Sequence, residues 1–141
     1  MHYNYGDSFG FALSKAASAM KNRFHQVLRA YKVTPEQTVV LLRLSETEGV
    51  SPTVLAEAIA KDKPNTVRII EKLMQKGLVF SAESVKDKRS YLIFLTKEGT
   101  RLKEQLIPIA EDLKKRALTG FLPEEVERFK FFLRKTYDNL R

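Results

Sequence analysis

"SPTVLAEAIAKDKPNTVRIIEKLMQKG", residues 51–77, contains two helical patterns separated by a few residues. Ser51 can serve as the N-cap of the first helix, and Pro52 suits its first position. The second helix is predicted to begin around residues 63–64 and to end near Gly77, a residue type common at helix C-termini. Two short helices this close together predict a helix-turn-helix, whose second helix has the right width for the major groove of DNA.

Both segments are amphipathic, because their apolar residues recur three or four positions apart. We expect the inward positions to be Val54, Leu55, Ala58 and Ile59 in the first helix, and Thr66, Ile69, Ile70, Leu73 and Met74 in the second.

Clear signals bound the elements on either side. Thr34, Pro35 and Gln37 form a capping box ahead of a short, heavily buried helix. Residues 78–84 and 90–96 are rich in β-branched and aromatic residues and predict two strands of a hairpin. A hairpin directly after a helix-turn-helix is the arrangement of a winged helix-turn-helix.

Long helices are predicted outside this core. One runs from Ser8, which with Asp7 is a candidate N-cap, to about Ala30. Another is capped by Thr96, runs from about Lys97 to Leu118 and is expected to bend at the proline inside it, Pro108.

The last amphipathic helix begins at about Pro123. The first and last helices have more apolar surface than a small winged domain can cover, which predicts a dimer. The expected fold class is therefore mainly α with a small β-hairpin wing. A winged helix-turn-helix domain is predicted over residues 34–96, with a helical dimerisation region formed by residues 1–33 and 97–141.

The composition narrows the function. The net charge is +8, and residues 61–103 hold 11 of the 25 lysines and arginines but only 5 of the 17 acids. This imbalance favours a polyanionic partner. Cysteine is absent and there are only two histidines, which argues against disulfides and thiolate or histidine-rich metal sites. The sequence has neither a glycine-rich phosphate-binding loop nor a nucleophile paired with a base, so nothing in it indicates an enzyme. Because the sequence has no signal peptide and no apolar run of about 18 residues, we expect a soluble cytoplasmic protein. We expect no cofactor.

The candidate DNA-binding residues lie mostly on the outward face of the second helix. Arg68 can bond guanine or phosphate, Asn65 can bond adenine, and Val67 can contact a thymine methyl group. Lys63 and Lys72 can meet phosphates. The candidate set also includes three residues at the starts of the two helices, namely Pro52, Thr53 and Pro64.

The predicted hairpin has a basic tip. Lys88 and Arg89 are candidates for DNA contact, and Arg89 suits a narrow minor groove because a planar guanidinium is weakly hydrated. Asp87 can hold that guanidinium by paired hydrogen bonds and lower the entropy lost on binding. A plain turn-forming role for Asp87 is the alternative.

Residues 54–99 resemble the winged helix-turn-helix core of the MarR family of bacterial transcriptional regulators. The resemblance rests on Asp62-Lys63-Pro64, Arg68, Asp87-Lys88-Arg89 and Leu95-Thr96-Lys97-Glu98-Gly99. It implies an obligate homodimer that binds a pseudo-palindromic DNA site, with recognition helices in the major groove and wings in the minor groove. It also implies DNA contacts by Arg68 and Arg89, with Asp87 supporting Arg89.

The resemblance further implies release by a small aromatic or phenolic effector. Such a ligand would bind in the crevice between the dimer helices and the winged domain, near Phe24, Leu28 and Tyr31. This chain departs from the family pattern at Asn65-Thr66-Val67, which affects base preference rather than fold. Two other functions remain open: a winged-helix module that binds protein or RNA, and a sequence-indifferent architectural DNA-binding protein.

Overall fold

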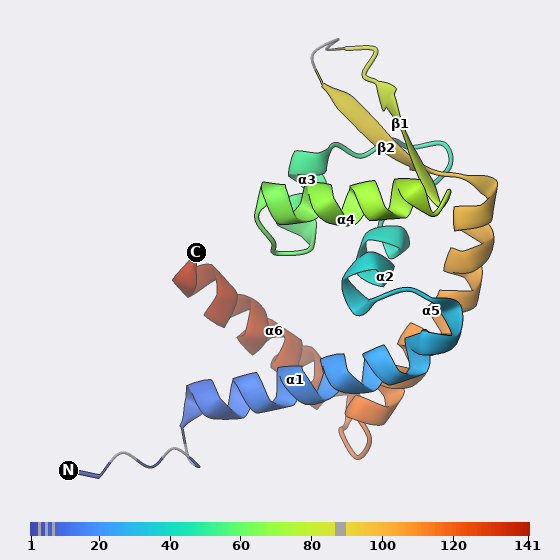
Figure 1. Ribbon diagram of the computed structural model, residues 1–141. Helices are drawn as coiled ribbons and strands as arrows, with labels where there is room; N and C mark the ends of the chain where they lie inside the picture. The colour runs from blue at the N-terminus through green and yellow to red at the C-terminus, as the bar shows by residue number, and fades with distance from the viewer. Residues whose placement is uncertain (3, 5, 7, 87–89) are drawn as a thin grey trace.

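The computed structural model describes residues 1–2, 4, 6, 8–86 and 90–141. In chain order the elements are α1 (Phe9–Leu28), the 3-10 turn η2 (Arg29–Tyr31), α2 (Pro35–Leu42), α3 (Pro52–Ala58), α4 (Lys63–Gln75), β1 (Val79–Glu83), β2 (Tyr91–Leu95), α5 (Lys97–Ala117) and α6 (Pro123–Leu140). The hairpin projects from one end of the molecule, α1 and α6 lie at the other, and α5 runs between them (Figure 1). None of the described helices is long and apolar enough to cross a bilayer.

The helix-turn-helix is built around α2, whose start is fixed by a complete capping box. The Thr34 hydroxyl accepts from the Gln37 amide at 3.1 Å, and the Gln37 side chain accepts from the Thr34 amide at 3.2 Å. The Lys76 ammonium at the end of α4 donates to the same Gln37 oxygen at 3.1 Å and to the Lys32 carbonyl at 2.5 Å. These bonds join the end of α4 to the start of α2, which fixes the orientation of α4.

The wing is a two-stranded antiparallel sheet in which Val79 pairs with Leu95 and Glu83 pairs with Tyr91. Val50 extends it by a single bridge, exchanging two backbone hydrogen bonds with Ile93 at 3.1 and 2.8 Å. Ile93 is fully buried. The base of the wing is therefore part of the hydrophobic core.

A close approach of backbone to backbone joins the wing to α5. The Leu78 carbonyl accepts from the Thr96 amide at 3.1 Å, and Thr96 caps α5 by accepting from the Gly99 amide at 3.0 Å. A Cβ at Gly99 would lie 2.0 Å from the Leu78 oxygen. Only glycine fits at this corner without displacing the backbone.

The core joins α2, α3, α4 and the wing to the ends of α1 and α5. Its fully buried side chains include Leu28, Leu41, Leu55, Leu73, Ile93 and Leu106. On α4, the predicted inward positions Thr66, Ile70 and Leu73 are confirmed.

Three predicted inward positions are wrong. Met74 is 40% exposed and Val54 is 57% exposed, and Ala58 is exposed as well. Each lies next to the buried face of its helix. That face contains Leu55 and Ala56 in α3, and Thr66, Ile70 and Leu73 in α4.

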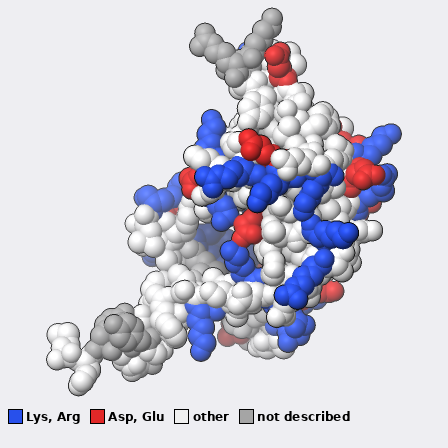
Figure 2. Space-filling model, viewed as in Figure 1, with Lys and Arg blue, Asp and Glu red and all other residues white. Residues whose placement is uncertain are grey.

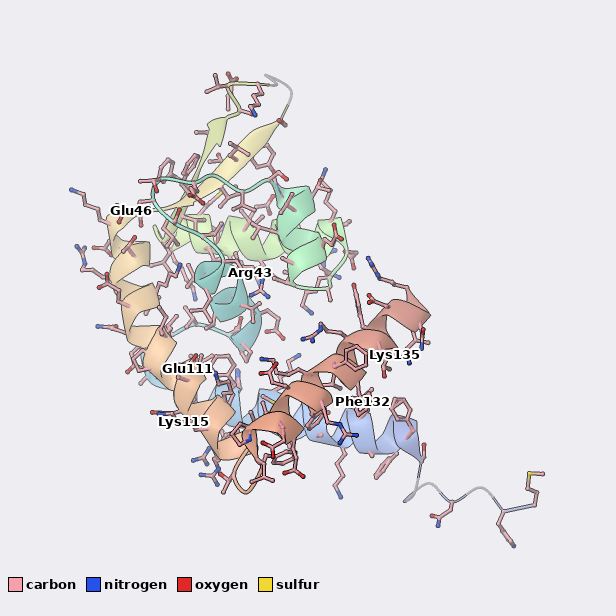
Figure 3. The ribbon with its side chains drawn as sticks, turned by 180° about the vertical axis from the view of Figure 1, so that it is seen from behind. Arg43, Glu46, Glu111, Lys115, Phe132 and Lys135 are labelled. Carbon is pink, nitrogen blue, oxygen red and sulfur yellow. The ribbon has the colours of Figure 1, made fainter. Side chains whose placement is uncertain are left out.

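The helices α1 and α6 have little buried surface within the chain. Leu28 is the buried residue of α1, and α6 has none among the described residues. Large apolar side chains are exposed instead: Phe9, Phe11, Leu13 and Met20 on α1, and Phe129, Phe131, Phe132, Leu133, Tyr137 and Leu140 on α6. Phe132 projects from α6 in the view of Figure 3.

The predicted helix boundaries hold with small differences. Ser8 is the N-cap of α1. The helix ends at Leu28 and is followed by η2, whose C-cap, Lys32, has a positive φ of 58°. The Glu125 carboxylate accepts from the Leu122 amide at 2.9 Å, so an acid helps to define the start of α6. Pro108 lies inside α5, which curves along its length (Figure 1).

Candidate nucleic-acid interface

The turn between α3 and α4 is closed by backbone hydrogen bonds and by Asp62. Ala60 adopts a positive φ of 55°, and the Lys61 amide donates to the Ala56 carbonyl at 3.0 Å. Asp62 then caps α4, because its carboxylate accepts from the Asn65 amide at 2.8 Å. This tight turn sets α4 across α3, as a helix-turn-helix requires.

Asp62 also holds a side chain on the exposed surface of α4. The Asn65 side-chain amide donates to the second Asp62 oxygen at 2.7 Å. Its own carbonyl oxygen remains free to accept. Hydrogen bonding from the Asn65 backbone lowers the pKa of Asp62 below its ordinary value of 3.8, so the carboxylate is ionised at neutral pH. Asn65 is therefore positioned before any partner binds.

The outward face of α4 carries the predicted residues. Lys63, Pro64, Asn65, Arg68 and Lys72 are exposed, and Val67 is half-buried. Lysines and arginines gather over α4 and the surface beside it (Figure 2). Such a face attracts phosphates by charge and presents both a guanidinium and an amide for base edges.

A shallow hollow of about 340 Å³ lies between α4 and the start of α2. Lys61, Arg68 and Lys72 line it together with Asn65, Ile69 and Glu36. Partial burial raises the pKa of Glu36, but the hydrogen bond and charge of Lys21, 2.7 Å away, outweigh it and lower the pKa below its ordinary value. The ionised Glu36 thus ties α1 to α2 beside the cationic surface.

The candidate residues of α3 differ in exposure. Thr53 is exposed at the start of the helix, whereas Pro52 is buried as its first residue. Little of the Pro52 side chain is available to a partner, so its position serves the helix start.

The hairpin stands beside α4, and its base is apolar. Phe80 and Phe94 stack with ring centroids 5.3 Å apart. Near the tip, the Ser84 amide donates to the Ser90 carbonyl at 3.1 Å. Asp87, Lys88 and Arg89 lie outside the described residues, so the DNA contacts of Lys88 and Arg89 and the supporting role of Asp87 stay predictions.

The crevice expected to hold an effector has a counterpart in the structure. Phe24 lines a pocket of about 300 Å³ with Met20, Pro35 and Leu113. Leu28 is fully buried in the core, and Tyr31 packs against the core while partly exposed. Only the first of the three predicted residues therefore faces this pocket. Among the described residues, no cluster of acids and histidines is suited to a metal ion.

Two residues of the candidate interface were missed by reasoning from the sequence. Lys61 lies between α3 and α4, where its sequence position alone gave it no role, yet it lines the same hollow as Arg68. Asp62 was recognised only as part of a motif. An aspartate directly before a lysine-proline helix start is a capping signal that could have identified it.

Comparison with known proteins gives a consistent set of relatives. The model of the MarR family matches residues 33–91. The chain is 25% identical over 130 residues to transcriptional regulator HosA of Escherichia coli O127:H6, with 83% of this chain and 96% of that protein covered. It is 28% identical over 108 residues to the organic hydroperoxide resistance transcriptional regulator of Bacillus subtilis, with 77% and 74% covered.

Solved structures agree along almost the whole chain. Bordetella bronchiseptica BpsR, whose DNA binding is regulated by 6-hydroxynicotinic acid, superposes with a TM-score of 0.86 and 28% identity over 98% of this chain and 99% of that one. Staphylococcus aureus MepR in complex with DNA superposes with a TM-score of 0.85 and 23% identity, covering 94% and 98%. The second similarity is one of fold.

Proposed function

The chain belongs to the MarR family, and we propose from this premise that it is a homodimeric, sequence-specific DNA-binding regulator of transcription. The observation that carries the proposal is the exposed face of α4. Arg68, Lys63 and Lys72 supply positive charge there, and Asn65 is already held by Asp62 at 2.7 Å. An amide held in place loses less entropy when it pairs with a base.

Each α4 enters the major groove, and each wing reaches towards the neighbouring minor groove. Residues 34–96 form the DNA-binding domain, and residues 1–33 with 97–141 form the dimerisation region. The exposed apolar faces of α1 and α6 support this division, because a soluble monomer rarely leaves so large an apolar surface uncovered. Two-fold symmetry then places the recognition helices about one DNA turn, roughly 34 Å, apart on a pseudo-palindrome.

The protein acts in the cytoplasm and is not an enzyme. Two relatives are named as transcriptional regulators, which supports a role without catalysis. A small aromatic effector that binds beside Phe24 would release the dimer from DNA by shifting α1 and α5 relative to α2.

Fluorescence anisotropy with DNA from immediately upstream of the protein's own reading frame tests the proposal. Arg68→Ala is expected to weaken binding by about 1–3 kcal/mol, because Arg68 contacts a base or a phosphate in the groove. Lys72→Ala is expected to reduce the slope of log affinity against log salt by about one, because one phosphate contact is lost.

Lys135→Ala is the matched control, since it removes an equal charge from α6, away from the proposed DNA face (Figure 3). Its affinity should equal that of the wild type. Equal losses for Lys135→Ala and Arg68→Ala would reject α4 as the recognition helix. Binding that unrelated competitor DNA abolishes at moderate salt would instead identify a sequence-indifferent DNA-binding protein.

A further inference from the structure

One acid lies on the exposed face of α4. Glu71 is the only acid among residues 63–75, where Lys63, Arg68 and Lys72 supply the charge that attracts DNA. Its side chain is exposed. A negative charge at this place weakens the attraction of α4 to every phosphate alike. Glu71 therefore lowers the affinity for DNA of any sequence, unless it makes a contact that only some sequences offer.

The geometry of α4 directs Glu71 away from the core. Thr66, Ile70 and Leu73 form the buried face of the helix. Because successive residues of a helix are about 100° apart, Arg68 and Glu71 lie on the opposite side. They are about 4.5 Å apart along the helix axis, close to the roughly 3.4 Å that separates neighbouring base pairs. The two side chains can therefore meet neighbouring base pairs.

The Glu71 carboxylate has no ion-pair partner within the part of the chain that the structure describes. Six ion pairs form among the described residues, and Glu71 belongs to none of them, although Arg68 lies three positions before it. Glu71 lines a hollow of about 220 Å³ between α4 and the wing, together with Val67, Met74 and Tyr91. Its oxygens are thus available to accept hydrogen bonds from DNA that enters beside α4.

We propose that Glu71 determines specificity by accepting a hydrogen bond from the N4 amino group of a cytosine in the major groove. Guanine and thymine present acceptors at this edge, which repel a carboxylate. Adenine presents its amino group beside the N7 acceptor, whereas cytosine presents its amino group alone. The cytosine lies next to the base pair that Arg68 contacts. This inference rests on the proposed function, because it requires α4 to enter the major groove.

Selection of binding sites from a random DNA library, followed by sequencing, tests the inference with the wild type, Glu71→Ala and Glu71→Gln. The wild type should enrich a pseudo-palindromic motif with a cytosine at one position of each half-site. Glu71→Ala should lose the preference at that position alone. Glu71→Gln should shift the preference towards adenine, because an amide pairs with adenine N6 and N7. Circular dichroism melting should show both variants to be folded, since alanine and glutamine suit an exposed helical position.

Fluorescence anisotropy then compares the selected site with a copy in which thymine replaces this cytosine. The wild type should bind the copy about tenfold more weakly, and Glu71→Ala should bind the two sites within about twofold of each other. Glu71→Ala should also bind unrelated DNA more tightly than the wild type does, because a negative charge is removed from the DNA face.

Glu104→Ala is the matched control. Glu104 is an exposed acid of α5 that belongs to no ion pair among the described residues. This variant loses the same charge and should keep the motif of the wild type, including its cytosine.

A Glu71→Ala motif identical to that of the wild type would overturn the inference and leave the proposed function intact. A preference lost at several positions together would overturn it as well, because Glu71 would then act through the placement of α4 or the wing. If the wild type bound DNA but enriched no motif, sequence-specific regulation and the role of Glu71 would both be refuted.

Discussion

Asp62 accepts hydrogen bonds from both the backbone and the side-chain nitrogens of Asn65, so one carboxylate caps α4 and holds an amide on its exposed face. The local structure and the proposed recognition of DNA therefore depend on the same residue. A change at Asp62 should affect stability and DNA affinity together, although Asp62 itself need not touch a base.

Asp62→Ala is expected to lower the urea midpoint of unfolding and to weaken operator binding, because α4 loses its cap and Asn65 loses its partner. Asp62→Asn should retain most of the midpoint at neutral pH, since asparagine also caps helices. Equal midpoints for the wild type and Asp62→Ala would show that the cap is unimportant.

The stability of the wild type and that of Asp62→Asn should also respond differently to acid. The pKa of Asp62 is lowered in the folded state, so its ionised form stabilises the fold above the ordinary value of 3.8, and this contribution is lost as pH falls through the folded pKa. The difference between wild type and Asp62→Asn should shrink over that acidic range. Urea midpoints measured stepwise from pH 7 to about pH 3 provide the check.

At the scale of residues, the sequence predicted the caps well and the inward faces less well. Thr34, Ser51 and Thr96 cap their helices as expected, because capping is decided by a few adjacent residues. Val54 and Met74 were assigned to the core wrongly, because an apolar side chain at the edge of a stripe can face either way. Which way it faces depends on the neighbouring element.

At the scale of elements, α5 begins at a corner that also contains the end of α4 and the start of β1. Gly99 makes this possible, because its missing side chain lets the helix approach the Leu78 carbonyl. The base of the wing and the start of α5 are thereby held together by backbone contacts.

Gly99→Ala is expected to destabilise the fold by about 1–3 kcal/mol, because its Cβ would lie 2.0 Å from the Leu78 oxygen and the backbone must move. Gly10→Ala is the matched control in the first turn of α1, where the nearest atom, the Ser8 hydroxyl oxygen, is 3.8 Å from the new Cβ. That change should be neutral or stabilising by up to about 1 kcal/mol. Thermal unfolding of both variants compares them, and similar melting temperatures would contradict the steric explanation.

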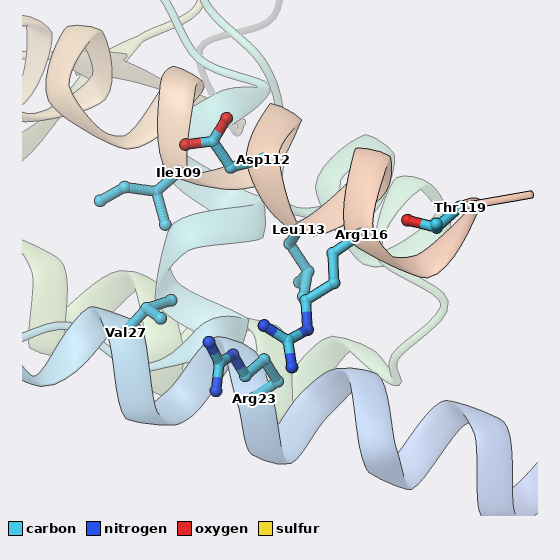
Figure 4. Close-up of a pocket in the computed structure, with 7 residues that line it drawn as sticks. All are labelled: Arg23, Val27, Ile109, Asp112, Leu113, Arg116 and Thr119. Atoms are coloured by element: carbon cyan, nitrogen blue, oxygen red, sulfur yellow. The ribbon is translucent and has the colours of Figure 1, made fainter.

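The order and type of these elements were predictable from the sequence, because each has its own start signal and periodicity. The single bridge between Val50 and Ile93 was not, since it joins an isolated residue to a strand far along the chain. The pocket that Arg23 of α1 and Arg116 of α5 line (Figure 4) was also not predictable, because α1 and α5 are far apart in the sequence.

At the scale of the whole molecule, the exposed apolar faces of α1 and α6 favour association with a second subunit. Phe129 is 40% exposed and Phe132 is 52% exposed in the single subunit. We expect the wild-type protein to sediment as a dimer at micromolar concentration, because burial of these faces drives association.

The double change of Phe129 and Phe132 to glutamate should give monomers, because charges would then be buried in the interface. Val54→Glu is the control, since Val54 is equally apolar and 57% exposed but lies on α3 in the proposed DNA-binding domain. Analytical ultracentrifugation measures all three proteins. A well-folded wild-type monomer would exclude the proposed assembly.

The exposure of α6 in the single chain should affect how the amount of active protein depends on the rate of its synthesis. Because no described residue of α6 is buried within its own chain, we expect a newly made subunit to stay vulnerable to proteases until it meets a second one. When subunits are scarce, the number of pairs grows with the square of the number of single chains. We therefore expect the regulator to accumulate more steeply than its rate of synthesis, which gives the cell a threshold below which the regulated genes respond little.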